Sequence, residues 1–287
     1  MFRKIKWVIW KSRQIFARRL SNFPFISGKN FADECDLRVT ADTINTKELN
    51  REVENSESIF VEGHLLFGFV ENFKEKLGSK VIISGNSDAN ITHKPNFTNQ
   101  PSAVLLQNSS IPTDTIYKTI PIGLENISLA RSGFKFQHKE IKQFKIVDRV
   151  LLPPMSPTNQ MRKSILEEAI NLSSFDVQVG FRPTSQYFKL VRDYKFIFVC
   201  EGNGYDTHRL WEVLYQNSYP VILETSWANS LRWLNLPILF VPNLTVIDQE
   251  LLSKHDAIFS QKKPIDYPQL WMPFWQELIK SKTKSGN

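Results

Sequence analysis

Short apolar runs alternate with segments of helical spacing along most of the chain. The runs that resemble strands lie at 58–62, 80–88, 102–108 and 117–123, and again at 148–152, 175–181, 194–200, 219–223 and 237–241. The main segments with helical spacing lie at 64–77, 158–171, 206–217, 226–234 and 267–280. Short apolar strands separated by helices are typical of parallel sheets covered on both faces. The pattern therefore predicts an α/β protein.

The alternating pattern is interrupted once, between residues 124 and 145. This stretch has no sustained period and carries charges of both signs. A strand-and-helix series on either side of such a break predicts two Rossmann-like domains with a cleft between them. The expected parts are a basic arm at 1–29, a first domain at 30–145, and a second domain with the C-terminal helix at 146–287.

The net charge of +7 is concentrated at the N-terminus. Residues 1–20 hold seven lysines and arginines and no acid, so of 36 basic residues 29 remain, against 29 acidic ones, in the rest of the chain. A neutral remainder disfavours nucleic-acid binding. Within 1–20 apolar and basic residues fall on opposite faces of a helical wheel, which is typical of a helix at an anionic membrane surface. A basic helix that packs against its own protein or frays in solution is the alternative.

The cysteine content and the lengths of the apolar runs indicate a cellular location. The chain has two cysteines, Cys35 and Cys200, which are too few for a disulfide framework and favour a reducing compartment. No run of 18 apolar residues occurs, so the sequence predicts no membrane span. We expect a cytoplasmic protein that is peripheral at the inner face of a membrane through residues 1–20.

Polar groups are concentrated in the stretch EGNGYDTHRLWEVLYQNSYPVIL, residues 201–223, where a buried strand is expected to lead into a helix. In open parallel sheets, ligands lie beyond the carboxyl ends of the strands. Glycines at that position let the backbone approach a ligand closely, and free N–H groups at a helix start favour phosphate. Asp206 or Thr207 is expected to cap the helix, which places His208 and Arg209 in its first turn.

Glu212 lies on the same helical face as His208, four residues later. A carboxylate one turn into such a helix can accept hydrogen bonds from ribose hydroxyls, which makes nucleotide binding our hypothesis for this stretch. The alternative for each residue alone is structural: a simple cap, and an exposed pair of Arg209 with Glu212 that contributes less than ~1 kcal/mol. The cluster as a whole favours the ligand-binding interpretation.

The residues of this stretch carry a family resemblance. FVCEGNGYDTHRLWEVLYQNSYPVIL, within 196–223, resembles the C-terminal signature of exostosin-like glycosyltransferases and their bacterial relatives in surface-polysaccharide synthesis. Weaker matches are VIISGNSD at 81–88 and IPIGLEN at 120–126. The resemblance implies a GT-B fold, in which two Rossmann-like domains hold a nucleotide-sugar donor, mainly in the second domain, and an acceptor, mainly in the first. The segment Gln216–Ser218 departs from the family pattern, which leaves an inactive copy as an alternative.

The resemblance also suggests roles for individual residues. The donor-binding residues implied are Gly202, Asn203, Gly204, Asp206, Thr207, His208, Arg209, Glu212 and Arg162. No D-x-D motif occurs, so a divalent metal has no obvious ligands and cationic side chains are expected to neutralise the leaving diphosphate. We therefore expect no cofactor and no metal. Arg162 and its neighbour Lys163 are equally compatible with a solvated helix face.

The catalytic base is sought at the carboxyl ends of strands, within reach of an acceptor hydroxyl. His64 follows the strand at 58–62, and Asp88 ends the strand at 80–88 in an equivalent position. Glu201 and Asp206 lie nearer the expected sugar, with a helix cap as the alternative for Asp206. The alternatives are a helix-start residue for His64 and a turn cap for Asp88.

These observations lead to one main hypothesis and one rival. The main hypothesis is a metal-independent glycosyltransferase that transfers a sugar from a nucleotide sugar to a glycan or lipid-linked acceptor. The rival is a non-catalytic Rossmann-type nucleotide-binding module, or an inactive transferase relative, tethered to a membrane. Neither hypothesis involves nucleic acid as a partner.

Overall fold

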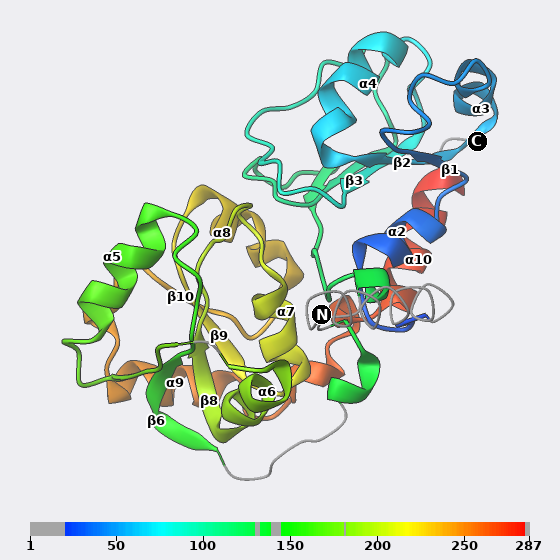
Figure 1. The fold of residues 1–287 in the computed structure, drawn as a ribbon. Coiled ribbons are helices and arrows are strands. Elements are labelled where there is room, and N and C mark those ends of the chain that lie inside the picture. The colour runs from blue at the N-terminus through cyan, green and yellow to red at the C-terminus, as the bar shows by residue number, and fades with distance from the viewer. Residues whose placement is uncertain (1–20, 130–132, 139–144, 181, 285–287) are drawn as a thin grey trace, which may run out of the picture.

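The computed structural model describes residues 21–129, 133–138, 145–180 and 182–284. The basic N-terminal arm predicted to contact a membrane, residues 1–20, lies outside the described residues. Two sheets, each of five parallel strands, organise the chain (Figure 1). The prediction of an α/β protein with two parallel sheets is confirmed.

The first sheet has the order β1-β2-β3-β4-β5. Its strands are β1 (Leu37–Val39), β2 (Ser58–Glu62), β3 (Val81–Gly85), β4 (Ala103–Leu106) and β5 (Tyr117–Thr119). Its helices are α2 (Gly28–Asp33), α3 (Leu49–Asn55) and α4 (Leu66–Phe73). Adjacent residues of β3 point to opposite faces: Ile82 joins the core under α3 and α4, whereas Val81 and Ile83 join the core that includes α2. Burial on both faces explains why the strands are continuous apolar runs.

The second sheet has the order β10-β9-β8-β6-β7. Its strands are β6 (Ile146–Leu152), β7 (Phe175–Val177), β8 (Tyr194–Phe198), β9 (Tyr219–Leu223) and β10 (Leu239–Val241). Its helices are α5 (Gln160–Ala169), α6 (Thr184–Asp193), α7 (His208–Tyr215), α8 (Ser226–Ser230) and α9 (Gln249–Phe259). Residues of α5 and α9 share the core of one face, and residues of α6 and α7 share the core of the other.

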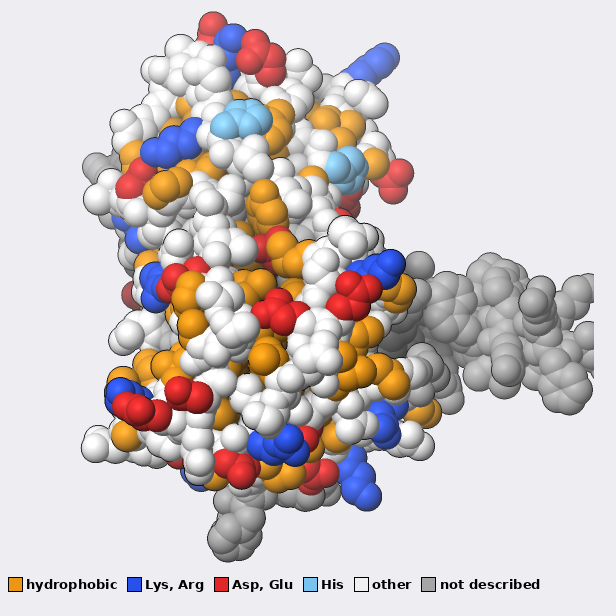
Figure 2. Space-filling model, turned by 90° about the vertical axis from the view of Figure 1, so that its left-hand side faces the viewer, with side chains coloured by type: hydrophobic (Ala, Val, Ile, Leu, Met, Phe, Trp, Pro, Cys, Tyr) orange, Lys and Arg blue, Asp and Glu red, His pale blue; other side chains and the backbone are white. Residues whose placement is uncertain are grey.

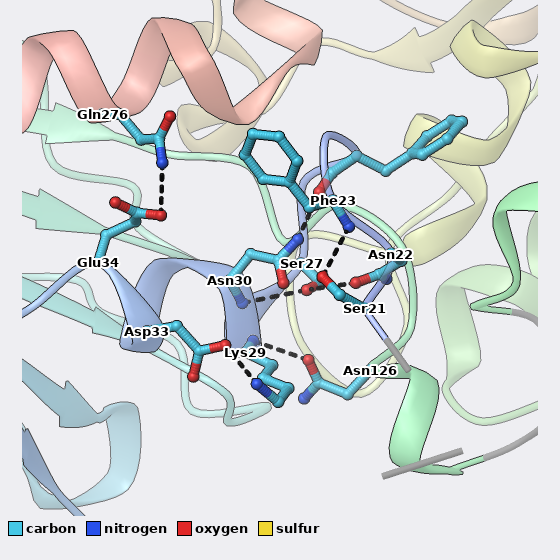
Figure 3. A network of polar contacts seen from close by, with 11 residues as sticks. Ser21, Asn22, Phe23, Ser27, Lys29, Asn30, Asp33, Glu34, Asn126 and Gln276 are labelled. Carbon is cyan, nitrogen blue, oxygen red and sulfur yellow. Dashed lines mark hydrogen bonds and ion pairs between the residues drawn. The ribbon is translucent and has the colours of Figure 1, made fainter. Parts of the chain in front are cut away.

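The C-terminal helix α10 (Met272–Lys284) packs against the first sheet. Trp275 is fully buried, and its ring lies 5.5 Å from that of Phe31 in α2. The Gln276 amide donates to the Glu34 carboxylate at 2.7 Å, as Figure 3 shows. The expected division at residue 146 grouped the helix with the second part of the chain, and Trp275 also packs against Trp233 of that part, with 5.8 Å between the ring centroids. Periodicity identified the helix but could not identify its partner, because an apolar stripe does not say which sheet will cover it.

Candidate functional site

The polar stretch lies where β8 leads into α7, as the sequence predicts. Helix α7 begins at His208, and Thr207 occupies the N-cap position. The Thr207 side chain makes no capping hydrogen bond, and its hydroxyl is buried without a partner among the described residues. The expectation that the side chain of Asp206 or Thr207 caps this helix is therefore wrong. The Asp206 carboxylate is turned to other partners.

Asp206 connects the two halves of the molecule, by which we mean the part built on the sheet β1–β5 and the part built on the sheet β6–β10. Its side chain is 4% exposed and accepts hydrogen bonds from the backbone N–H of Ile122 at 2.9 Å and from the Trp211 indole at 2.9 Å. Its own backbone N–H donates to the Asn108 side chain at 2.7 Å. Burial raises the pKa of Asp206 to about 7, and the hydrogen bonds from Ile122 and Trp211 oppose the rise. We had expected Asp206 near the sugar of a donor, but these bonds assign it a structural role.

Neighbouring residues make further contacts between the halves, and we call this group of contacts around Asp206 the joint. The His208 ring donates from Nδ1 to the Gly123 carbonyl at 2.8 Å, and the Asn203 amide donates to the Asp88 carboxylate at 3.3 Å. A Cβ on Gly204 would lie 2.8 Å from the Asn108 side-chain oxygen, so a larger residue would displace the group that accepts the Asp206 backbone hydrogen bond. Because Asp88 and Asn108 follow β3 and β4, the carboxyl edges of the two sheets meet at the joint.

A cavity of about 590 Å³ lies at the carboxyl edge of the second sheet. It is bounded by the loops that follow β6 and β7 and by helices α5, α6 and α7. Its lining residues are Pro154, Met155, Ser156, Pro157, Arg162, Gly180, Arg182, Thr184, Tyr187, Arg209 and Glu212. The volume falls in the range of small-molecule sites, and the position is the one at which α/β proteins bind ligands.

Three arginines of the cavity are held by uncharged groups. Arg162 donates from Nε to the Glu201 carbonyl at 2.8 Å, and Arg209 donates to the Pro154 carbonyl at 2.7 Å. Arg182 donates to the Gln178 amide oxygen at 2.6 Å. None of the three guanidinium groups is ion-paired with a carboxylate in the part of the chain that the structure describes. Planar guanidinium groups suit phosphate, so the cavity has the charge of an anion site.

Glu212 and Tyr187 complete the wall. Glu212 is 6% exposed on α7 and lies one turn after His208, as predicted. The Arg209 guanidinium lies over the Tyr187 ring, 5.4 Å from its centroid. Burial first, and then the charge of Glu212, raise the pKa of the Tyr187 hydroxyl, which keeps it neutral.

Sequence reasoning missed Arg182 and Tyr187. The signal that could have found Arg182 is its place directly after the apolar run at 175–181, at the carboxyl end of a parallel strand, where ligands bind. Arg182 follows β7 in the segment GFRPTSQYF, and Tyr187 lies one turn into the next helix, α6.

Other predicted donor residues lie outside the cavity wall. The backbone N–H of Gly202 donates to the Gly204 carbonyl at 2.9 Å, so it is not free for a phosphate. The Glu201 carboxyl is half-buried beside Thr225, and burial raises its pKa while the Thr225 hydroxyl lowers it. The loop therefore supports Arg162 through the Glu201 carbonyl, and the arginine side chains rather than the loop backbone line the cavity.

The candidate bases of the first half are separate from the cavity. His64 is exposed directly after β2, and Asp88 is exposed at the joint. Neither is among the residues that line the cavity. The structure thus brings Arg162, Arg209 and Glu212 together in the cavity wall, whereas His64, Asp88 and Glu201 do not line it. Glu201 meets Arg162 through its backbone carbonyl.

Within the described ranges, no group of three or more histidine, cysteine, aspartate or glutamate side chains could hold a metal ion. The helices of the described residues include none with the length and apolar character needed to cross a membrane.

Comparison with known proteins adds no family assignment, since no family model and no curated protein matches this chain.

Proposed function

We propose that the protein is a metal-independent glycosyltransferase of the GT-B type, which uses a nucleotide-sugar donor. The observation that carries the proposal is the cavity with three arginines and no carboxylate paired to them among the described residues. A diphosphate carries the opposite charge, and fixed cations at its oxygens stabilise the leaving group as the bond to the sugar breaks. The resemblance of 196–223 to exostosin-like enzymes supports the same chemistry.

Four cavity residues contact the donor in this proposal. Arg162, Arg182 and Arg209 neutralise the diphosphate, and Glu212 accepts hydrogen bonds from ribose hydroxyls. Arg209 is held in place by Pro154 and by the Tyr187 ring, so little side-chain entropy is lost when a ligand binds. A glycan or lipid-linked acceptor would approach from the first half, where His64 and Asp88 are the candidate bases.

The seven basic residues of 1–20 support a proposed location at an anionic membrane surface on the cytoplasmic side. There the enzyme would reach a lipid-linked acceptor.

One observation favours a second candidate function. None of the predicted bases lies in the cavity wall. A nucleotide-binding module without catalysis needs the arginines and Glu212 but no base, and it fits the same cavity.

A thermal-shift panel of UDP-, GDP-, ADP-, CMP- and dTDP-sugars tests the proposal. A ligand at 100 times its Kd should stabilise the fold by about 2.7 kcal/mol. We expect at least one nucleoside-diphosphate sugar to stabilise the fold, and EDTA should not change this stabilisation. When an acceptor is added, the nucleoside diphosphate should be released. Stabilisation without turnover would favour the binding module. No stabilisation by any of the five would refute both.

A further inference from the structure

A second cavity lies in the second half, at the edge of its sheet. It has a volume of about 330 Å³ and is bounded by the edge strand β10, the 3-10 helix η4 (Arg232–Leu234) and helix α9. The described residues that line it are all different from those of the arginine cavity, by which we mean the cavity that Arg162, Arg182 and Arg209 line. We refer to the second cavity as the His255 cavity.

The wall of the His255 cavity is largely apolar. Its lining includes the partly exposed rings of Phe240 and Phe259. The aliphatic residues of the wall are each at most 6% exposed: Leu231, Leu236, Ile238 and Leu239. The volume lies near the lower end of the range for small-molecule sites. A wall of aliphatic and aromatic side chains favours an apolar ring, which gains from burial and from contact with the phenylalanine rings.

His255 places an unpartnered polar group in this wall. Its side chain is 7% exposed, and its Nε2 has no hydrogen-bond partner among the described residues. The imidazole lies among aromatic rings, 4.7 Å from that of Phe259 and 5.3 Å from that of Tyr219. Burial lowers the pKa of His255 to about 4, and the Pro237 backbone and the charge of Asp256 oppose this effect. The imidazole is therefore neutral at physiological pH.

The neutral imidazole determines which polar group a ligand should carry. One nitrogen of a neutral imidazole donates a hydrogen bond and the other accepts one. A hydroxyl group can both donate and accept, so it suits Nε2 whichever nitrogen carries the proton. A buried polar atom without a hydrogen bond is unfavourable, and a ligand that supplies the missing bond removes that loss.

The charges at the rim of the His255 cavity are already paired. Arg232 is ion-paired with Glu224 at 2.5 Å, and its guanidinium carbon lies 4.1 Å from the centroid of the Phe240 ring. Its Nε donates to the Asn229 side chain at 2.9 Å. Acidic and basic side chains also lie side by side on the lower part of the face in Figure 2, which belongs to the second half. The rim therefore favours an uncharged ligand, in contrast to the arginine cavity.

We propose that the His255 cavity binds a small uncharged molecule that carries an aromatic ring and one hydroxyl group. The ring packs against Phe240 and Phe259, and the hydroxyl forms a hydrogen bond with the His255 imidazole. This inference does not rest on the proposed function, because the two cavities have no lining residue in common.

The test is an NMR titration of the full chain with 4-methylphenol and with toluene, which has the same ring and methyl group but no hydroxyl. We expect 4-methylphenol to bind with a Kd below about 0.5 mM. Toluene should bind about tenfold more weakly, because it leaves the imidazole without a partner. This comparison uses the wild-type protein and needs no variant.

His255→Phe keeps an aromatic ring in the wall and removes its nitrogens. It should lower the affinity for 4-methylphenol about tenfold and leave the affinity for toluene unchanged, so that the two probes bind alike. Retained toluene binding also shows that the cavity is intact in the variant. Ile258→Ala, at an exposed residue of the same helix, is the matched control and should bind both probes as the wild type does.

Three results would overturn the inference: no binding of 4-methylphenol at about 5 mM, equal affinity of the wild type for the two probes, or an unchanged preference for 4-methylphenol in His255→Phe. His255→Phe should leave stabilisation by nucleotide sugars unchanged. If 4-methylphenol binds as expected and no nucleotide sugar stabilises the fold, the proposed function fails and the His255 cavity remains a binding site.

Discussion

At the scale of single residues, one short segment serves two purposes. Asp206 and His208 form hydrogen bonds with the first half, whereas Arg209 and Glu212 line the cavity. Because these four residues lie within seven consecutive positions, the position of the first half and the shape of the cavity are physically linked. The Trp211 indole completes the link, since it is buried in the core and donates to Asp206.

The first prediction concerns Asp206→Asn. The folded protein holds the Asp206 proton up to about pH 7, whereas the unfolded chain releases it near 3.8. A proton bound more tightly in the folded state stabilises the fold at low pH, and this contribution falls as the pH rises. The unfolding free energy of the wild type, relative to the variant, should therefore fall by about 1–2 kcal/mol between pH 5 and pH 7 and level off only above about pH 8.

Urea unfolding at pH 5, 6, 7 and 8 measures this difference. Asp88→Asn, at an exposed carboxylate of the same joint, is the matched control. A difference that grows with pH would show that the hydrogen bonds of Asp206 outweigh its burial.

At the scale of elements, α10 holds the two halves together. The Trp275 ring lies 5.5 Å from that of Phe31 in the first half and 5.8 Å from that of Trp233 in the second. Its indole also donates to the Gln269 carbonyl at 3.0 Å. One buried side chain thus packs against both halves, which makes the C-terminal helix part of the joint.

The second prediction is that Trp275→Ala destabilises the whole protein. Truncation of a fully buried tryptophan typically costs 3–5 kcal/mol, because the cavity is only partly refilled. We expect a loss of about that size in the free energy of unfolding, measured with urea. Glu277→Ala, at an exposed position of the same helix, should change it by less than about 0.5 kcal/mol. A loss below about 1 kcal/mol for Trp275→Ala would mean that α10 is not part of the core.

The sequence predicted the limits of helices and strands better than the tertiary contacts between them. The strand at 58–62 was placed with correct limits, because a fully buried strand is a continuous apolar run. Strand β1 was missed because its three residues include the exposed Arg38, and helix α9 was missed because its apolar face is narrow. Arg209 and Glu212 were found through local spacing. The partners of Asp206 were not, because Ile122 lies 84 residues away and no local pattern records that contact.

At the scale of the whole molecule, the two sheets share a core. One hydrophobic cluster contains Val81 and Ile83 of the first sheet, Leu151 and Ile197 of the second, and Trp275 of α10. Interfaces between independent domains are usually more polar than this. The two halves are therefore one structural unit, although each has its own sheet.

The third prediction follows from the shared core. Thermal unfolding should be a single transition, with the same midpoint by tryptophan fluorescence and by far-UV circular dichroism. Two separate transitions would show that the halves unfold independently and that the joint contributes little.

The most direct test of the central claim is calorimetric titration of Arg209→Ala and Glu212→Gln with the nucleoside diphosphate of the best sugar donor and with pyrophosphate. Charge-assisted hydrogen bonds contribute roughly 1.5–3 kcal/mol each, so Arg209→Ala should lower the affinity for both ligands by about one to two orders of magnitude. Glu212→Gln should weaken the nucleoside diphosphate and leave pyrophosphate unaffected. Arg232→Ala, at an exposed arginine of the same half, should change neither. Unchanged affinity in both cavity variants, with the fold intact, would contradict the assignment of this cavity to a nucleotide-sugar donor.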